Sequence, residues 1–183
     1  MVDALWQRRI ENVITLLNSL NKNQKWAKEY WTLVLHQLKK KENAYMTNLV
    51  EVSGGNRFQR DIAHKTIAFM IKKLMPRMRT LDIEVVICDI KSDAVGYAMM
   101  TDNNRTFELE IDKKINLQNL VTTICHEMIH VKQYARNEIN GIDPCWKGRN
   151  IPEDTDYWNL PWEKEAYRLQ KKYADEIWES DLL

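Results

Sequence analysis

The region from residue 106 to residue 135 changes from a strand pattern to a helix pattern, and this change constrains the fold more than any other feature. Apolar and acidic residues alternate in residues 106–112, so one face of that strand would be buried and the other wet. The residues on its buried face are Phe107, Leu109 and Ile111. Apolar residues then recur at helical spacing through residues 117–135, and Asn116 can cap this helix. A half-buried strand that leads directly into a helix indicates an α+β fold, with the strand near a sheet edge.

Other segments extend this α+β pattern in both directions along the chain. Helical spacing predicts further helices at residues 3–19, 24–41 and 57–79, and Pro161 opens a final helix after a long polar stretch, residues 136–160. Strands are expected at residues 83–88 and 95–101. The break at residues 52–56 is the best candidate boundary. We therefore expect a helical N-terminal segment, residues 1–55, and a second domain, residues 56–183.

The composition excludes little, but it does indicate a compartment. The chain has 27 basic and 26 acidic side chains and a net charge of +1, which favours no class of partner. No stretch has the apolar length of a membrane span or the uninterrupted apolar core of a signal peptide. Three cysteines without a CxxC spacing are typical of reduced thiols. We therefore expect a cytoplasmic protein that does not enter a membrane.

The expected helix at residues 57–79 has one strongly basic side. It contains seven Lys or Arg residues against Asp61 alone, a balance of 7 − 1 = +6. A solvated helix face is the simpler interpretation, and a surface for nucleic acid or an acidic partner is the alternative.

The helix at residues 117–135 contains the motif His-Glu-Met-Ile-His. At 100° per residue, His126 and His130 lie about 40° apart, on the side of the helix away from its apolar stripe. Two imidazoles placed in this way can converge on one metal ion, and Glu127 lies beside them. A bare HExxH also occurs by chance, but the residues around this pair are uncharged except for Lys132, as a buried metal site needs.

This motif resembles the active-site helix of the zincin metallopeptidases. The expected order of elements in residues 57–180 is similar to the minimal zincin core, which implies a helix, a three-stranded, mostly antiparallel sheet, the active-site helix and a further ligand-bearing helix. The resemblance also implies that zinc is bound by His126 and His130, with Glu127 as general base. In that family the strand before the helix binds substrate as an added strand, so residues 106–112 would form the rim of the cleft.

The third ligand has to come from an acidic residue downstream. No histidine follows His130, which excludes the metzincin arrangement and argues against a site like that of the SprT-like proteases. Glu163 and Glu165 in the final helix are the two candidates. Glu165 shares its side of the helix with charged residues, as on a solvated face, whereas Glu163 shares its side with residues that can face a cleft. The Glu-x-x-Ala spacing of Glu163 and Ala166 also resembles the ligand helix of the gluzincins, so Glu163 is preferred and Glu165 stays open.

The leading hypothesis is a zinc-dependent metallopeptidase acting on a protein or peptide. Tyr134 and Tyr157 are candidate donors to the oxyanion. The stretches HEMIHVKQY and PWEKEA are also similar to small uncharacterised metallopeptidase-like proteins, including phage-encoded ones. One alternative is a metallohydrolase acting on a non-peptide amide. Another is an interaction or nucleic-acid-associated protein with a structural or inactive zinc site, completed by a fourth protein ligand such as Cys145 or Asp143.

Overall fold

The computed structural model describes residues 4–20, 24, 27–36, 48–140, 144–180 and 182. The chain divides into two compact units, Met1–Asn48 and Leu49–Leu183. Within the first unit, α1 spans Ala4–Ser19, and residues 27–36 are also helical. The first helix was expected to begin at residue 3 and the second to span residues 24–41; residues 3, 25–26 and 37–41 lie outside the described residues.

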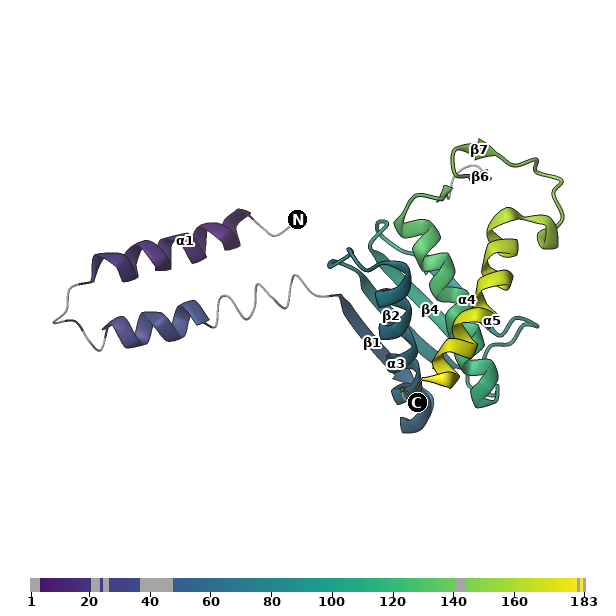
Figure 1. Cartoon of the computed structure of the whole chain (residues 1–183), viewed down its shortest axis with the longest axis horizontal. Helices are drawn as coiled ribbons and strands as arrows, with labels where there is room; N and C mark the ends of the chain where they lie inside the picture. Colours follow the sequence, from purple (N-terminus) through teal and green to yellow (C-terminus); the bar gives the residue numbers. More distant parts are fainter. Residues whose placement is uncertain are drawn as a thin grey trace. The chain divides into compact units, whose positions relative to one another are not determined.

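The second unit is built on a four-stranded sheet (Figure 1). Its strands are β1 (Leu49–Gly54), β2 (Asp82–Cys88), β3 (Gly96–Met100) and β4 (Thr106–Asp112). The strand order is β1-β2-β4-β3, with β1, β2 and β4 parallel and β3 antiparallel to β4. The α+β class is therefore confirmed, but the expected three-stranded, mostly antiparallel sheet is wrong in strand number and direction.

The connections explain why this sheet is mainly parallel. A helix, α3 (Arg57–Leu74), links β1 to β2, and such a crossover joins parallel strands. The chain then runs to the far edge as β3 and returns in a hairpin as β4, which enters the sheet beside β2. Because β1 pairs with β2, residues 49–54 are part of the second unit, although they were expected in the N-terminal segment.

The strand β4 occupies the interior of the sheet and not its edge. It pairs with β2 on one side and with β3 on the other, so β3 is the edge strand nearest to it. The expected alternation is present, since Phe107, Leu109 and Ile111 are buried. Alternating burial shows only that one face of a strand is covered. An interior strand of a sheet that is covered on one face has the same pattern as an edge strand, so the pattern could not distinguish the two.

The helix α3 begins as a capped helix and ends earlier than the sequence pattern suggested. The Asn56 side chain accepts from the Gln59 amide, and the Gln59 side chain accepts from the Asn56 amide, which forms a capping box. The helix ends at Leu74 and not at residue 79, because Pro76 disfavours the helical conformation of Met75 before it. Of its basic side chains, Lys65 pairs with Asp61 at 3.2 Å, as on an ordinary solvated face.

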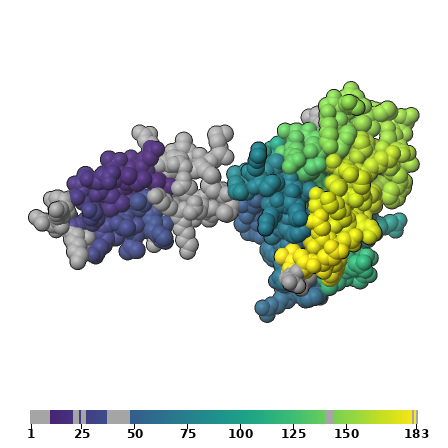
Figure 2. All heavy atoms as spheres, viewed as in Figure 1, coloured from purple at the N-terminus to yellow at the C-terminus, as the bar shows by residue number. Residues whose placement is uncertain are grey.

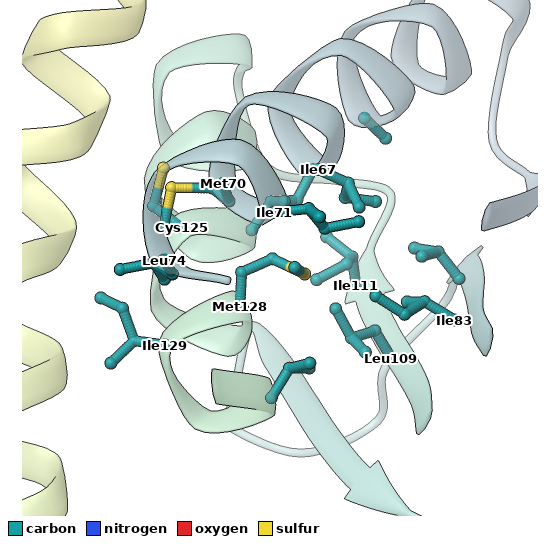
Figure 3. Close-up of a cluster of buried hydrophobic side chains, with 14 of the residues drawn as sticks. Ile67, Met70, Ile71, Leu74, Ile83, Leu109, Ile111, Cys125, Met128 and Ile129 are labelled. Carbon is teal, nitrogen blue, oxygen red and sulfur yellow. The ribbon is translucent and has the colours of Figure 1, made fainter. Parts of the chain in front are cut away.

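Two further helices complete the second unit. The helix α4 spans Leu117–Ala135 and is capped by Asn116, and α5 spans Pro161–Glu179 and opens on its proline; both features were expected. Apolar side chains from α3, the sheet and α4 interdigitate in the core (Figure 3). Burying each large apolar side chain contributes about 1.5–3 kcal/mol. This packing fixes α4 against the sheet, while α5 packs on another side of α4.

The segment between α4 and α5 is more ordered than a polar loop. It forms three short antiparallel strands, β5 (Ile139–Asn140), β6 (Cys145–Trp146) and β7 (Arg149–Asn150), followed by the 3-10 turn η1 (Tyr157–Asn159). In the space-filling view, this segment and α5 lie together on the visible face (Figure 2). None of the described helices combines the length and apolarity needed to cross a membrane.

Candidate metal centre

His126 and His130 of α4 lie at its interface with α5, and Glu127 lies beside them, near Gly96 at the start of β3. His126 and His130 are each 9% exposed and Glu127 is 6% exposed, so all three are largely withdrawn from water. The opposite side of α4 packs into the core through residues such as Ile124 and Met128. The periodicity of α4 therefore orients the histidine pair away from the sheet and toward α5.

The first turn of α5 brings Glu163 to the histidine pair. Its carboxylate oxygens lie 3.4 Å from the Nε2 atom of His126 and 3.4 Å from the Nε2 atom of His130. The two Nε2 atoms are 3.0 Å apart. One ligand atom from each of the three residues falls within 4.8 Å of the others, and all three residues are buried. This buried His-His-Glu group could hold a metal ion.

Two properties of this group fit a cation. Glu163 Oε2 is buried and has no hydrogen-bond partner among the described residues, which is costly for a carboxylate unless something else compensates its charge. Each histidine also directs its other ring nitrogen at a glutamine oxygen: His126 Nδ1 lies 2.7 Å from Gln170 Oε1, and His130 Nδ1 lies 2.8 Å from Gln133 Oε1. These contacts leave both Nε2 atoms facing Glu163 as candidate ligands.

The electrostatics of the two site glutamates differ. Burial raises the pKa of Glu163, but the neighbouring His126, His130 and Tyr157 lower it more, and the resulting pKa is about 2. Glu163 is therefore an anion at neutral pH. Burial raises the pKa of Glu127, although His126 and His130 oppose the shift. A raised pKa suits a carboxylate that accepts and releases a proton.

The other candidate ligand, Glu165, points to a different set of groups. Its Oε2 atom lies 2.7 Å from Lys132 Nζ and 3.0 Å from Gln133 Nε2, and its side chain is only 14% exposed. The expectation that Glu165 lies on a solvated face is therefore wrong, because α4 covers it. Lys132, the one charged residue near the motif, is buried between Glu165 and Glu138, at 2.7 Å from each.

A pocket of about 540 Å³ opens beside His126 and Glu127. Residues 93–96, which lead into β3, form one wall, and Tyr157 and Tyr167 contribute to another. A Cβ atom on Gly96 would lie 2.6 Å from Thr123 Cγ2 and 3.1 Å from Glu127 Oε1. A glycine is therefore required for the edge strand to pass this close to Glu127.

The remaining sequence candidates separate clearly. Tyr157 lines the pocket and interacts with Glu163, whereas Tyr134 packs against the core and is not among the residues that line the pocket, although the Glu163 charge also raises its pKa. Among the described residues, the group able to hold a metal contains His126, His130 and Glu163 and does not include Cys145. Asp143, the other suggested fourth ligand, lies outside the described residues.

Known proteins provide no guide to this site. Comparison of the chain with protein-family models, with curated proteins and with solved structures finds no match. We therefore infer function from the geometry of the site.

The glutamines beside the two histidines were not anticipated. The sequence analysis assigned neither Gln133 nor Gln170 a contact with a histidine. Gln133 follows His130 by three residues, a spacing that places two side chains on adjacent turns of one helix face. That spacing is the signal that could have identified it.

Proposed function

We propose that this protein is a zinc-dependent metallopeptidase of the zincin type, with a ligand arrangement like that of the gluzincins. The observation that carries the proposal is the buried group of His126, His130 and Glu163, with Glu127 opening onto the adjacent pocket. Two imidazoles and one carboxylate are a common ligand set for catalytic zinc, which keeps a further position for water.

The chain's own residues would divide the chemistry among them. Bound zinc would polarise the scissile carbonyl and lower the pKa of the attacking water. Glu127 would accept a proton from that water and deliver it to the leaving nitrogen. The Tyr157 hydroxyl, at the wall of the pocket, would donate a hydrogen bond to the carbonyl oxygen as negative charge develops there.

The substrate would bind as an extended peptide along β3. This strand, and not residues 106–112, is the sheet edge next to the pocket, so its outer backbone groups can pair with an added strand. Tyr157, Trp158 and Tyr167 form a chain of ring contacts beside the pocket, with centroids 5.2–5.4 Å apart, and each is at least 40% exposed. Such an exposed aromatic group favours a substrate with a large apolar side chain.

The test is to measure zinc content and peptide cleavage in parallel. We expect about one zinc per chain, and cleavage of a peptide library that stops when the metal is chelated. Glu127→Gln should retain zinc and fold normally but lose at least ~10²-fold in kcat, because the amide cannot accept the proton. Full activity in Glu127→Gln would exclude the proposed base.

The two alternative functions predict different outcomes of the same experiment. A hydrolase acting on a non-peptide amide would share the zinc and the dependence on Glu127 but leave every peptide intact. An interaction protein would bind zinc without turnover, and its basic helix α3 would bind DNA with an affinity that falls steeply as salt rises. We place it behind the peptidase because Lys73, like Lys65, already has an acidic partner, Glu176 at 2.7 Å.

A further inference from the structure

Behind His130 lies a polar side chain that is entirely buried. Gln133 is 0% exposed and makes three hydrogen-bond contacts. Its Oε1 atom lies 2.8 Å from His130 Nδ1, and its Nε2 atom lies 3.0 Å from the Trp162 carbonyl oxygen and 3.0 Å from Glu165 Oε2. The side chain therefore bridges a candidate ligand on α4 to the first turn of α5.

These contacts determine which way the Gln133 amide points. A backbone carbonyl and a carboxylate can only accept hydrogen bonds, so the group between Trp162 and Glu165 has to be the amide nitrogen. The amide oxygen then faces His130, and it can only accept. His130 consequently carries its proton on Nδ1, which leaves the Nε2 lone pair directed at the metal group.

Glu165 is itself held in place. Lys132 Nζ donates to it at 2.7 Å and Lys147 Nζ donates to it at 3.2 Å, while Lys132 is also fixed by Glu138. One carboxylate oxygen thus accepts from Lys132 and from the Gln133 amide, and the other accepts from Lys147. A group anchored in this way can act as a fixed reference for the orientation of the Gln133 amide.

The other histidine has a simpler arrangement. His126 Nδ1 contacts Gln170 Oε1 at 2.7 Å, and among the described residues no second hydrogen bond determines the orientation of the Gln170 amide. The two histidines therefore differ, because only the tautomer of His130 is determined by a chain of hydrogen bonds.

We propose that Gln133 and Glu165 are positioning residues for the metal centre, which hold His130 as the Nδ1-protonated tautomer and tie its orientation to the docking of α5. Glu165 would thus act on the metal without binding it. The consequence for metal affinity rests on the proposed function, whereas the tautomer is a property of the protein before metal binds.

The first measurement is made on the metal-free wild-type protein. Two-bond correlations between protons and nitrogens of the imidazole rings, in a sample labelled with ¹⁵N at histidine and held at alkaline pH, distinguish the two neutral tautomers. We expect His130 to be protonated on Nδ1. A His130 protonated on Nε2 would overturn the proposal. The measurement uses the wild-type protein alone, so it does not depend on whether a variant folds.

The second measurement is zinc affinity, determined by competition with a chelator. Gln133→Met removes the acceptor for His130 while keeping a buried side chain of similar size, and we expect affinity to fall about 10- to 100-fold. Lys171→Met on α5 is the control, since that side chain is 80% exposed and, among the described residues, pairs with Asp175 alone; the zinc affinity of this variant should not change. Unchanged affinity in Gln133→Met would count against the proposal.

A reciprocal exchange tests the direction of the hydrogen bonds. Gln133→Glu alone brings two carboxylates together and should weaken zinc binding. Adding Glu165→Gln restores one amide and one carboxylate, so the double variant should bind zinc at least about tenfold more tightly than Gln133→Glu. Absence of this recovery in a folded double variant would contradict the proposed network. Neither affinity nor tautomer depends on turnover, so a protein that binds zinc but cleaves no peptide would refute the peptidase function and leave this proposal standing.

Discussion

Glu163 and Glu165 lie only two residues apart in the first turn of α5, yet their surroundings are very different. Glu163 faces two imidazoles and keeps one buried oxygen without a hydrogen bond among the described residues. Glu165 faces Lys132, Lys147 and an amide. One carboxylate thus retains capacity to bind a cation, while the charge of the other is already compensated by lysines. The difference shows that the groups opposite a glutamate, and not its helix position alone, decide whether it can be a ligand.

The largest expected effect separates these two residues directly. Glu163→Ala removes the only anionic member of the metal group, and we expect zinc affinity to fall by at least about 100-fold, or ~3 kcal/mol. Glu165→Ala keeps all three ligands and should still bind about one zinc per chain, with weaker affinity. Equilibrium dialysis at increasing chelator concentrations measures both. Full zinc binding in Glu163→Ala would reverse the assignment.

The side of the turn on which Glu165 pairs with Lys132 and Lys147, here called the lysine side, should contribute to stability and not to the number of bound metal ions. Lys132→Met leaves Glu138 and Glu165 without the buried cation between them, and we expect the free energy of unfolding to drop by about 2–4 kcal/mol. Lys147→Met is the matched comparison. Because that side chain is 47% exposed, its loss should cost less than about 1 kcal/mol. Denaturant unfolding measures both, and equal losses would show that burial does not distinguish the two pairs.

The sequence predicted the ligand side of this turn, where Glu163 faces His126 and His130, but not the lysine side. The spacing of His126 and His130 determines their common direction on any helix, and the neighbours of Glu163 favoured it over Glu165. Helical angles cannot show that α4 would cover Glu165, because that depends on how two helices pack. The hydrogen bonds of Gln133 could not be predicted for the same reason, because they join α4 to α5 and depend on how the two helices pack.

The fold shows a similar division between local and long-range information. Caps and helical spacing predicted both ends of α4 and the start of α5, whereas the C-terminal end of α3 was misplaced because the effect of Pro76 was not considered. The strand β1 was missed because Gly54 and Gly55 follow its short pattern closely and were interpreted as part of a domain boundary. The strand at residues 106–112 was expected near a sheet edge, whereas β4 inserts between β2 and β3 in the structure. That choice depends on pairing across the sheet, which no single segment encodes.

Acid should weaken the lysine side of the turn in a defined pH range. Burial raises the pKa of Glu165, but Lys132, Gln133 and Lys147 lower it from an ordinary value of 4.5 to about 2. A lowered folded-state pKa contributes stability that is present above about pH 4.5 and is lost as the pH falls toward 2. The contribution is at most about 3 kcal/mol. Metal-free Glu165→Gln should show a smaller loss of stability than the metal-free wild type between these pH values, and identical profiles would contradict the shift.

The smallest expected effect tests whether the ligand side adjoins a reactive pocket. Gly96→Ala places a Cβ atom close to Thr123 and Glu127, and we expect about a tenfold drop in kcat with zinc retained. Adding Thr123→Ser removes the methyl group responsible for the closest contact, so stability should recover more than kcat does. Unchanged kcat in Gly96→Ala would show that this edge of β3 does not constrain the base.

A crystal structure of the zinc-loaded protein, with anomalous scattering recorded on both sides of the zinc absorption edge, tests the central claim most directly. We predict one anomalous peak, bonded to Nε2 of His126, Nε2 of His130 and a carboxylate oxygen of Glu163, with Glu165 still paired to Lys132. A peak bonded to Glu165 in place of Glu163, or no peak between the two histidines, would contradict the account.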